Sequence, residues 1–227
     1  MFVRLEPDKR IPEELREIYA HLAGNVMETY GALDELMSLF GTKEIVNVLN
    51  ATAAAFFVRH QRLLIDNIIL SLSRMTDEKQ SGSGQENLSL PHLLELTDPK
   101  HQGLRTDLHK KWIEIKGAAK HLRTYRHTLL AHADLAQHVS RASKLGGDIS
   151  IGSVKKLFDQ ISDFLNAFDY FFTGVETTSY HPPAAYGDTS GLIAYLKLAI
   201  ETETKIQNER LKAADEASGR MEVPPSG

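Results

Sequence analysis

Cysteine is absent from this chain of 227 residues, and so are long apolar runs. Disulfides, thiolate zinc sites and cysteine nucleophiles are therefore excluded. The most apolar short stretch, residues 53–58, is far too short to cross a bilayer. Residues 1–15 lack the apolar core of a signal peptide. We therefore expect a soluble, cytoplasmic protein that contacts no membrane.

A large excess of charge of one sign is also absent. The formal net charge is −4, the apolar fraction is 42% and the charged fraction is 25%, which is typical of soluble globular proteins. Any nucleic-acid site must then be a local patch and not the whole surface. The sequence contains no phosphate-binding glycine loop, Gly-x-Ser-x-Gly elbow or His-Glu-x-x-His motif.

Proline and glycine interrupt the chain at few places, and stretches with helical periodicity lie between them. This pattern predicts long helices over residues 12–40, 43–75, 104–135, 153–172 and 191–214. A short helix capped by Ser89 is expected to end at Leu96. Without a repeat or a convincing strand, the layout predicts an all-α bundle. The second helix is apolar on most sides, which predicts a central position covered by several neighbours.

The helix expected over residues 104–135 carries two different faces. Its apolar side chains recur on a stripe that should face the core, namely Trp112, Ile115, Leu122, Tyr125 and Leu129. Its basic side chains recur at steps of four, three and four on another face, namely Lys116, Lys120, Arg123 and His127. This basic column, about 16 Å long, could follow a nucleic-acid strand. A solvated face is the simpler interpretation of the same column.

Arg126 and His132 stand out on this helix because arginine grips phosphate and histidine moves protons near neutral pH. His132 lies on or beside the apolar stripe, and Arg126 borders it on the basic side. The two side chains can share a groove only if a second surface creates one, and a second copy of the helix would do so. From the helix alone, a core histidine with an ordinary polar partner is the simpler interpretation of His132.

No metal site and no cofactor are expected. His127 and His132 are five residues apart, whereas two metal ligands on one helical face are three or four residues apart. His127 and Asp134 are seven apart and could form a surface polar pair.

The stretch from Leu122 to Asp134, LRTYRHTLLAHAD, resembles the signature of HEPN domains. These are helical bundles whose motif is arginine, a polar residue, a few further residues and histidine. The stretch is most similar to the abortive-infection AbiU-type branch. A second piece resembles the segment that precedes the motif in that branch, namely Leu72–Asp77, a loop, Asn87–Leu90, Leu93 and Leu94.

The resemblance spans roughly Pro12 to Gly174 and implies a HEPN-like antiparallel helical bundle with an extra C-terminal helix. We expect the bundle over residues 1–174, a loop and an amphipathic helix over 175–215, and a disordered tail over 216–227.

The usual activity of that family is metal-independent RNA cleavage by a homodimer, often in toxin–antitoxin or antiviral systems. The resemblance implies an endoribonuclease that leaves 2′,3′-cyclic phosphate ends, with an antitoxin protein as a candidate partner. Arg126 and His132 match the two signature positions, where Arg126 would stabilise the added charge and His132 would transfer a proton. His127 occupies the polar position, in which asparagine or aspartate is commoner.

Further residues join the site by the same resemblance. Lys116, Lys120 and Arg123 would hold the RNA strand, and Tyr125, Asp134 and Arg74 would support the motif. Arg74 and Asp77 are expected to form an ion pair at a helix end, or else to border the groove. The alternative is a non-catalytic HEPN module that binds RNA, a nucleotide or a protein partner.

Overall fold

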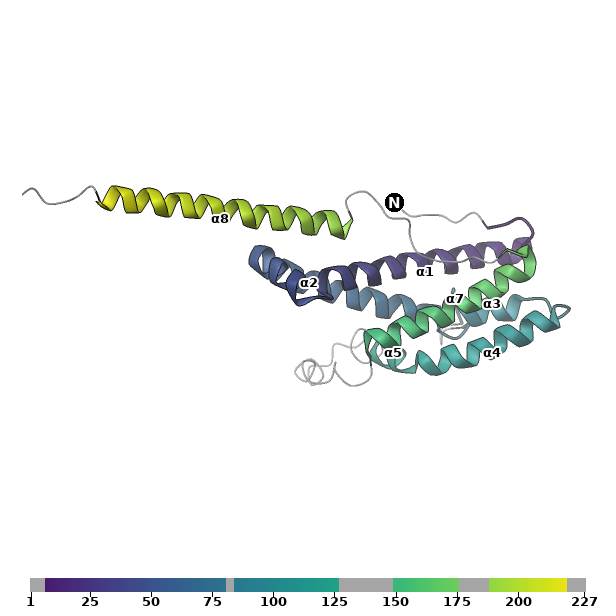
Figure 1. The fold of residues 1–227 in the computed structure, drawn as a ribbon. Helices are drawn as coiled ribbons and strands as arrows, with labels where there is room; N and C mark the ends of the chain where they lie inside the picture. Colours follow the sequence, from purple (N-terminus) through teal and green to yellow (C-terminus); the bar gives the residue numbers. More distant parts are fainter. Residues whose placement is uncertain (1–6, 81–83, 127–148, 176–187, 220–227) are drawn as a thin grey trace, which may run out of the picture. The chain divides into compact units, whose positions relative to one another are not determined.

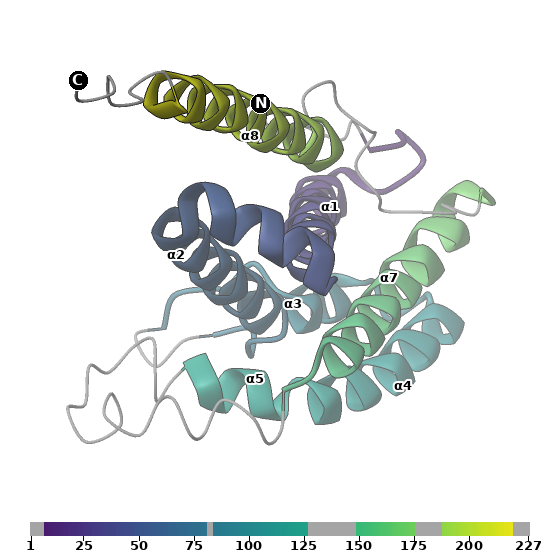
Figure 2. The same cartoon turned by 60° about the vertical axis from the view of Figure 1, so that its left-hand side comes forward.

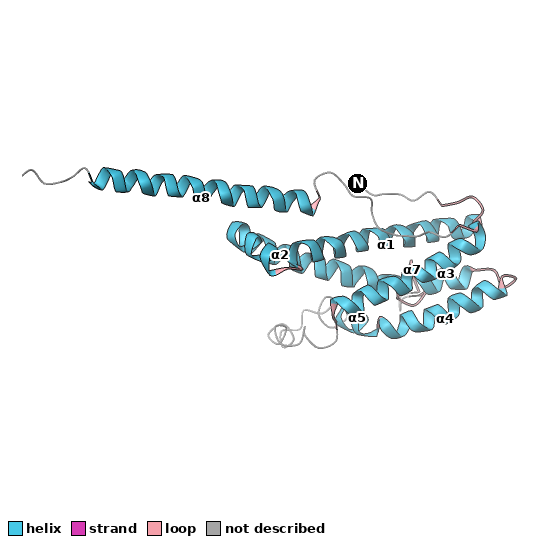
Figure 3. Cartoon of the chain, in the orientation of Figure 1, coloured by secondary structure: helices cyan, strands magenta, loops and turns pink. Residues whose placement is uncertain are grey.

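The computed structural model describes residues 7–80, 84–126, 149–175 and 188–219 (Figure 1). The helices among them are α1 (Glu13–Phe40), α2 (Lys43–Met75), α3 (Leu90–Leu96), α4 (Gln102–Ala118), α5 (Lys120–Tyr125), α7 (Ile151–Thr173) and α8 (Thr189–Gly219). Within these ranges no strand is drawn (Figure 3), and the β-type pairing is an isolated bridge between Gln80 and Glu86. The expected all-α class is confirmed. In the described part of the chain, no helix is long and apolar enough to cross a membrane.

The chain divides into two compact units. The first unit comprises the described residues of Met1–Asp34 and Leu63–Pro183, and it contains α3, α4, α5 and α7 with the adjoining parts of α1 and α2. The second unit comprises the described residues of Glu35–Arg62 and Ala184–Gly227, which form the α1–α2 corner and α8.

Local chemistry explains where the helices begin and end. The carbonyl oxygen of Pro12 accepts a bond from Leu15 N (3.0 Å), and acidic residues in the first turn of α1 suit the positive end of its dipole. Between α1 and α2, a Cβ on Gly41 would collide with the carbonyl oxygen of Met37, so this sharp corner requires glycine. Thr42 then caps α2 by accepting a bond from Ile45 N (3.3 Å). The predicted bounds of α1 and α2 are confirmed at this corner.

The core of the first unit forms where α7 meets α1 and α4. α4 and α7 run side by side in both views (Figure 1, Figure 2). α1 contacts α7 through two aromatic pairs, Tyr19 with Phe168 (ring centroids 5.3 Å apart) and Tyr30 with Phe158 (5.8 Å). The apolar stripe predicted on α4 and α5 is buried at each of its described positions, namely Trp112, Ile115, Leu122 and Tyr125.

In the second unit, α8 packs only its first turns against the α1–α2 corner. Ile193 and Leu196 contact a buried cluster formed by Leu39, Leu49 and Phe57. Lys197 adds an ion pair with Glu44 (2.8 Å). From Glu201 to Glu216 the described side chains of α8 are exposed.

Three expectations about helices are wrong. The helix predicted over 104–135 divides at Ala119 (ψ −8°) into α4 and α5, two residues after Gly117, a poor helix former; its part beyond Arg126 lies outside the described residues. α2 is not covered on all sides, because Phe56 is 54% and Leu63 is 66% exposed. The last helix is longer than predicted, since α8 covers Thr189–Gly219.

A kink at Ala53 explains why the apolar side chain of Phe56 on α2 is exposed. Ala53 has a non-helical backbone (φ −145°, ψ 56°), so residues before and after it do not share one helical register. Around the kink the buried positions are Leu49 and then Phe57, eight residues later, while Phe56, seven residues after Leu49, is exposed.

Two smaller expectations also need correction. Ser89 occupies the N-cap position of α3, but its side chain makes no capping bond and its buried Oγ has no hydrogen-bond partner. α7 begins at Ile151, two residues before the predicted start, with a capping box between Ser150 and Ser153, and its C-cap is Gly174 in the left-handed region (φ 65°). The apolar positions of the helix predicted over 153–172 include Phe171, but this side chain is 46% exposed and contacts His101 edge to face.

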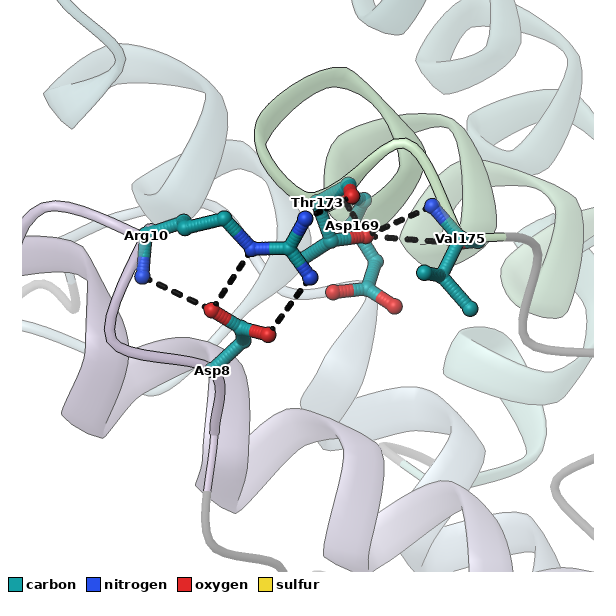
Figure 4. A network of polar contacts seen from close by, with 5 residues as sticks. All are labelled: Asp8, Arg10, Asp169, Thr173 and Val175. Carbon is teal, nitrogen blue, oxygen red and sulfur yellow. Dashed lines mark hydrogen bonds and ion pairs between the residues drawn. The ribbon is translucent and has the colours of Figure 1, made fainter.

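The segment before α1 caps the end of α7 (Figure 4). Arg10 donates a hydrogen bond to the carbonyl oxygen of Thr173, in the last turn of α7, where carbonyl groups lack helical partners and the dipole is negative. Asp8 holds the guanidinium through Arg10 Nε (3.0 Å) and Nη2 (2.7 Å). The hydrogen bonds from Arg10 lower the pKa of Asp8 to about 2. We call Asp8, Arg10 and Thr173 the N-terminal clasp.

We expect Asp8→Asn to destabilise the fold in a pH-dependent way. The folded-state pKa is depressed from 3.8, so the stabilisation is fully present above that value and is lost as the pH falls through about 2. Urea denaturation between pH 2 and 7 should therefore show a wild-type advantage that shrinks below pH 4. Asp107→Asn, which removes an exposed carboxylate from α4, is the control and should show no such trend. A difference that is equal at pH 7 and pH 2 would contradict the role of the Asp8 charge.

Candidate functional site

The motif residue Arg126, directly after α5, reaches back to the end of α2. Its Nη1 lies 2.5 Å from Oδ2 of Asp77, and the two side chains are 16% and 23% exposed. A charge-assisted bond between partly buried groups fixes the guanidinium more firmly than a surface ion pair does. Asp77 therefore positions the arginine of the motif.

Two further basic residues meet the same short segment, Thr76-Asp77-Glu78, which we call the 76–78 turn. Arg123 donates from Nη1 to the carbonyl oxygen of Thr76 (2.8 Å). Lys116 pairs with Glu78 (Nζ to Oε1 2.6 Å). Arg123 also donates from Nη2 to the carbonyl oxygen of Lys116 (3.0 Å), which joins α5 to the end of α4. Three consecutive residues thus each receive one cation.

The 76–78 turn is held rigidly from within. The backbone nitrogens of Thr76 and Asp77 donate to the carbonyl oxygens three residues earlier, both at 3.2 Å, which tightens the last turn of α2. The hydroxyl of Thr76 is buried and donates to the carbonyl oxygens of Leu72 (3.0 Å) and Ser73 (3.1 Å). The carboxylate of Asp77 is therefore presented from a fixed backbone.

The segment before α3 braces the turn from outside. Asn87 donates from Nδ2 to the carbonyl oxygen of Glu78 (2.8 Å) and from its backbone to that of Lys79 (2.6 Å). Lys79 pairs with Glu95 of α3 (3.1 Å). The carbonyl oxygen of Asn87 is bonded in turn to Nδ1 of His92 (2.9 Å). The two pieces of sequence that resemble the HEPN pattern are thus in direct contact at the 76–78 turn.

The charges at the turn do not cancel. Among the described residues that make these contacts, Lys116, Arg123 and Arg126 contribute three positive charges, and Asp77 and Glu78 contribute two negative charges, which leaves one net positive charge. The Lys116–Glu78 pair lies outermost, at 49% and 61% exposure, and the Arg126–Asp77 pair lies deeper. An approaching anion would therefore meet lysine first and arginine behind it.

The structure brings some of the predicted site residues together and separates others. Lys116 and Arg123 lie together beside Arg126, whereas Lys120 is exposed on α5 and Tyr125 is buried. His127, His132 and Asp134 lie outside the described residues, and their roles stay predictions.

The expected ion pair between Arg74 and Asp77 is wrong. Asp77 gives its carboxylate to Arg126, Arg74 is exposed, and the described contact between Asp77 and Arg74 is the backbone bond from Asp77 N to Arg74 O.

Comparison with protein families identifies the family of this chain. A HEPN family described as AbiU2 matches residues 12–180, which is more than half of the 227 residues. The chain belongs to the AbiU2 family of HEPN proteins. No curated protein and no solved structure matches it.

The match identifies this chain as an abortive-infection-type HEPN module. It covers each helix from α1 to α7 that the structure describes and stops before α8. Among the described residues, no group of three or more histidine and acidic side chains could hold a metal ion.

Sequence reasoning missed the role of Asp77 as the partner of Arg126. One signal for it exists. Two acidic residues lie two and three residues after the end of α2, where the dipole is already negative, and such a cluster needs cations from elsewhere in the fold. The basic column of the neighbouring helix is the obvious source.

We expect Asp77→Ala to lower the free energy of unfolding by about 1–3 kcal/mol, because Arg126 would lose a charged partner in a partly buried place. A double-mutant cycle with Arg126→Ala should give a coupling of about 0.5–3 kcal/mol. The same cycle on the more exposed pair Glu78 and Lys116 is the control and should give less than about 1 kcal/mol. Zero coupling between Asp77 and Arg126 would contradict the positioning role.

Proposed function

We propose that this chain is a metal-independent endoribonuclease that acts as a homodimer in an abortive-infection or toxin–antitoxin system. The observation that carries the proposal is the fixed position of the motif arginine, Arg126, beside Lys116 and Arg123 at the 76–78 turn. The family supplies the biological setting, and the cluster of cations supplies a place for an RNA phosphate.

Arg126 is suited to bind a phosphate while Asp77 holds it. A guanidinium has five N–H donors, and the bond to Asp77 engages Nη1. Asp77 orients the planar group, and phosphate oxygens would be gripped by its fork geometry. Lys116, which is half exposed, would attract the neighbouring phosphate of the strand.

The proposed reaction is an internal transfer at phosphorus. The 2′-oxygen of a ribose attacks the adjacent phosphorus and loses its proton, and the bond from phosphorus to the 5′-oxygen breaks as that oxygen gains a proton. His132 carries one of these two proton transfers, and Arg126 stabilises the negative charge that builds up on the phosphoryl oxygens. The products are a 2′,3′-cyclic phosphate and a 5′-hydroxyl. DNA, which lacks the 2′-hydroxyl, is not a substrate.

A second copy of the chain completes the proposed site. On the predicted continuation of the helix, His132 borders the apolar stripe, so that a groove containing both motif residues needs a second surface. Two copies related by a two-fold axis would bring two Arg126–His132 pairs together. An antitoxin protein that covers this groove would silence the enzyme.

A non-catalytic HEPN module is the second candidate function, and one observation favours it. Arg126 is already neutralised by Asp77, as in many purely structural ion pairs. In that case Lys116 and Arg123 would bind RNA, a nucleotide or an acidic protein surface without chemistry.

RNA cleavage by purified protein separates the two candidates. Wild-type protein should cut single-stranded RNA equally with EDTA or with Mg²⁺, and mass spectrometry should find cyclic phosphate ends. His132→Ala and Arg126→Ala should each lower the rate by at least about 100-fold. Arg126→Lys keeps the charge but loses the fork, and should fall in between.

Lys110→Gln, which changes an exposed charge away from the 76–78 turn, is the matched control and should cleave like wild type. All variants must be purified identically, because a contaminating nuclease would cut with every preparation. If His132→Ala cuts as fast as wild type, or if wild type binds RNA and leaves it intact, the nuclease proposal is overturned.

A further inference from the structure

An open pocket of about 690 Å³ lies in the first unit between α3 and α4. Its lining includes Pro91 and Glu95 of α3 and Gln102, Arg105, His109 and Trp112 of α4. The volume is within the range of small-molecule sites in proteins, about 300–1,000 Å³. None of these residues belongs to the 76–78 turn.

The lining combines basic side chains, Arg105 and His109, with apolar ones, Pro91, Leu94, Pro99 and Trp112. Arg105, His109 and Trp112 follow at steps of four and three, so one face of α4 presents all three to the pocket. Trp112 is 7% exposed, so a small part of its side chain lines the pocket, together with Pro91 and Leu94.

The charged groups of the pocket are held in place. Arg105 donates from Nη1 to the carbonyl oxygen of Thr97 (2.7 Å), and this single bond leaves most of its donors unengaged in the contacts described. Glu95 is paired with Lys79 (3.1 Å), which offsets its repulsion of an incoming anion. The pocket therefore offers a fixed guanidinium next to an apolar surface.

Two contacts connect the neighbours of the pocket residues to the 76–78 turn. Trp112 precedes Lys116 by four residues, about 6 Å along the axis of α4, and Lys116 is bonded to Glu78. On the other side, Glu95 is bonded to Lys79, the residue after Glu78. A strand whose phosphate lies at Arg126 would therefore pass Lys116 and reach the pocket within a few nucleotides.

We propose that the α3–α4 pocket binds one nucleotide of a single-stranded RNA, with its phosphate at Arg105 and His109 and its base against the apolar lining formed by Pro91, Leu94 and Trp112. This inference rests on the proposed function, because it extends the path of the same RNA strand beyond Arg126. Gln102 offers an amide that can donate to and accept from the edge of a base. Contact with apolar side chains tolerates any base, so the pocket contributes affinity more than sequence preference.

The chain reports on this pocket directly, since Trp112 is its only tryptophan. Tryptophan fluorescence is titrated with 5′-AMP and, separately, with an eight-nucleotide RNA carrying 2′-O-methyl groups, which cannot be cleaved. Both ligands should give a saturable change, with the RNA binding more tightly because it also meets Lys116 and Arg126. If neither ligand changes the fluorescence, the proposal is overturned. If AMP alone does so, the pocket serves a free nucleotide and the RNA path is overturned.

Two pocket variants and one control sharpen the result. Arg105→Gln and His109→Ala should weaken AMP binding, the former by about tenfold or more, because each removes a group that faces the phosphate. Lys110→Gln removes an equal charge from α4 outside the pocket and should bind like wild type. Circular dichroism checks that Arg105→Gln, which loses the bond to Thr97, is folded; the exposed His109 makes no such bond to the described backbone. Unchanged AMP affinity in both variants would overturn the assignment.

The pocket proposal and the nuclease proposal can be overturned independently of each other. The titrations are repeated with Arg126→Ala, which is cleavage-deficient under the proposed function and should keep its AMP affinity. AMP and RNA binding without any cleavage by wild type would overturn the nuclease and leave the pocket standing. Where RNA is cleaved, Arg105→Gln should raise KM about tenfold and leave kcat within about twofold. Cleavage kinetics identical to wild type would overturn the pocket and leave the nuclease standing.

Discussion

The negative end of α2 imposes the arrangement on which the site depends. The dipole of a long helix ends there, and Asp77 and Glu78 add two carboxylates within three residues of the last helical residue, Met75. This accumulation would be unfavourable by itself, and cations from α4 and α5 neutralise it. Arg126 is therefore needed where it lies for the stability of the fold, before any ligand is considered.

This double use of the same cations has a consequence for binding. A phosphate that binds Arg126 shares the guanidinium with Asp77. The negative charge of Asp77 therefore weakens the attraction between Arg126 and the phosphate. The benefit is a guanidinium that is already oriented, which reduces the conformational entropy lost on binding. The half-exposed Lys116 supplies the longer-range attraction, and this part weakens as salt concentration rises.

Sequence patterns were sufficient for the features that depend on local chemistry. Pro12, Gly41 and Thr42 mark helix ends through backbone geometry and capping, and the bounds of α1 and α2 follow from them. The buried stripe from Trp112 to Tyr125 follows from helical period. The outward position of Phe56 does not, because a single distorted residue, Ala53, changes which side of α2 is covered. The partner of Arg126 is also beyond a helical wheel, since Asp77 is 49 residues away in sequence and only the tertiary fold brings it near.

The N-terminal clasp links residues near the two ends of the first unit. The bond from Arg10 to Thr173 joins residues 163 positions apart and so closes nearly the whole unit into a non-covalent ring (Figure 4). Ring closure over such a distance requires the intervening helices to be in place, because the entropy of a long open chain opposes it. The clasp is therefore a long-range contact, of the kind that slows folding relative to contacts within one helix. Once closed, it makes the fraying of α7 and the release of the residues before α1 a single event.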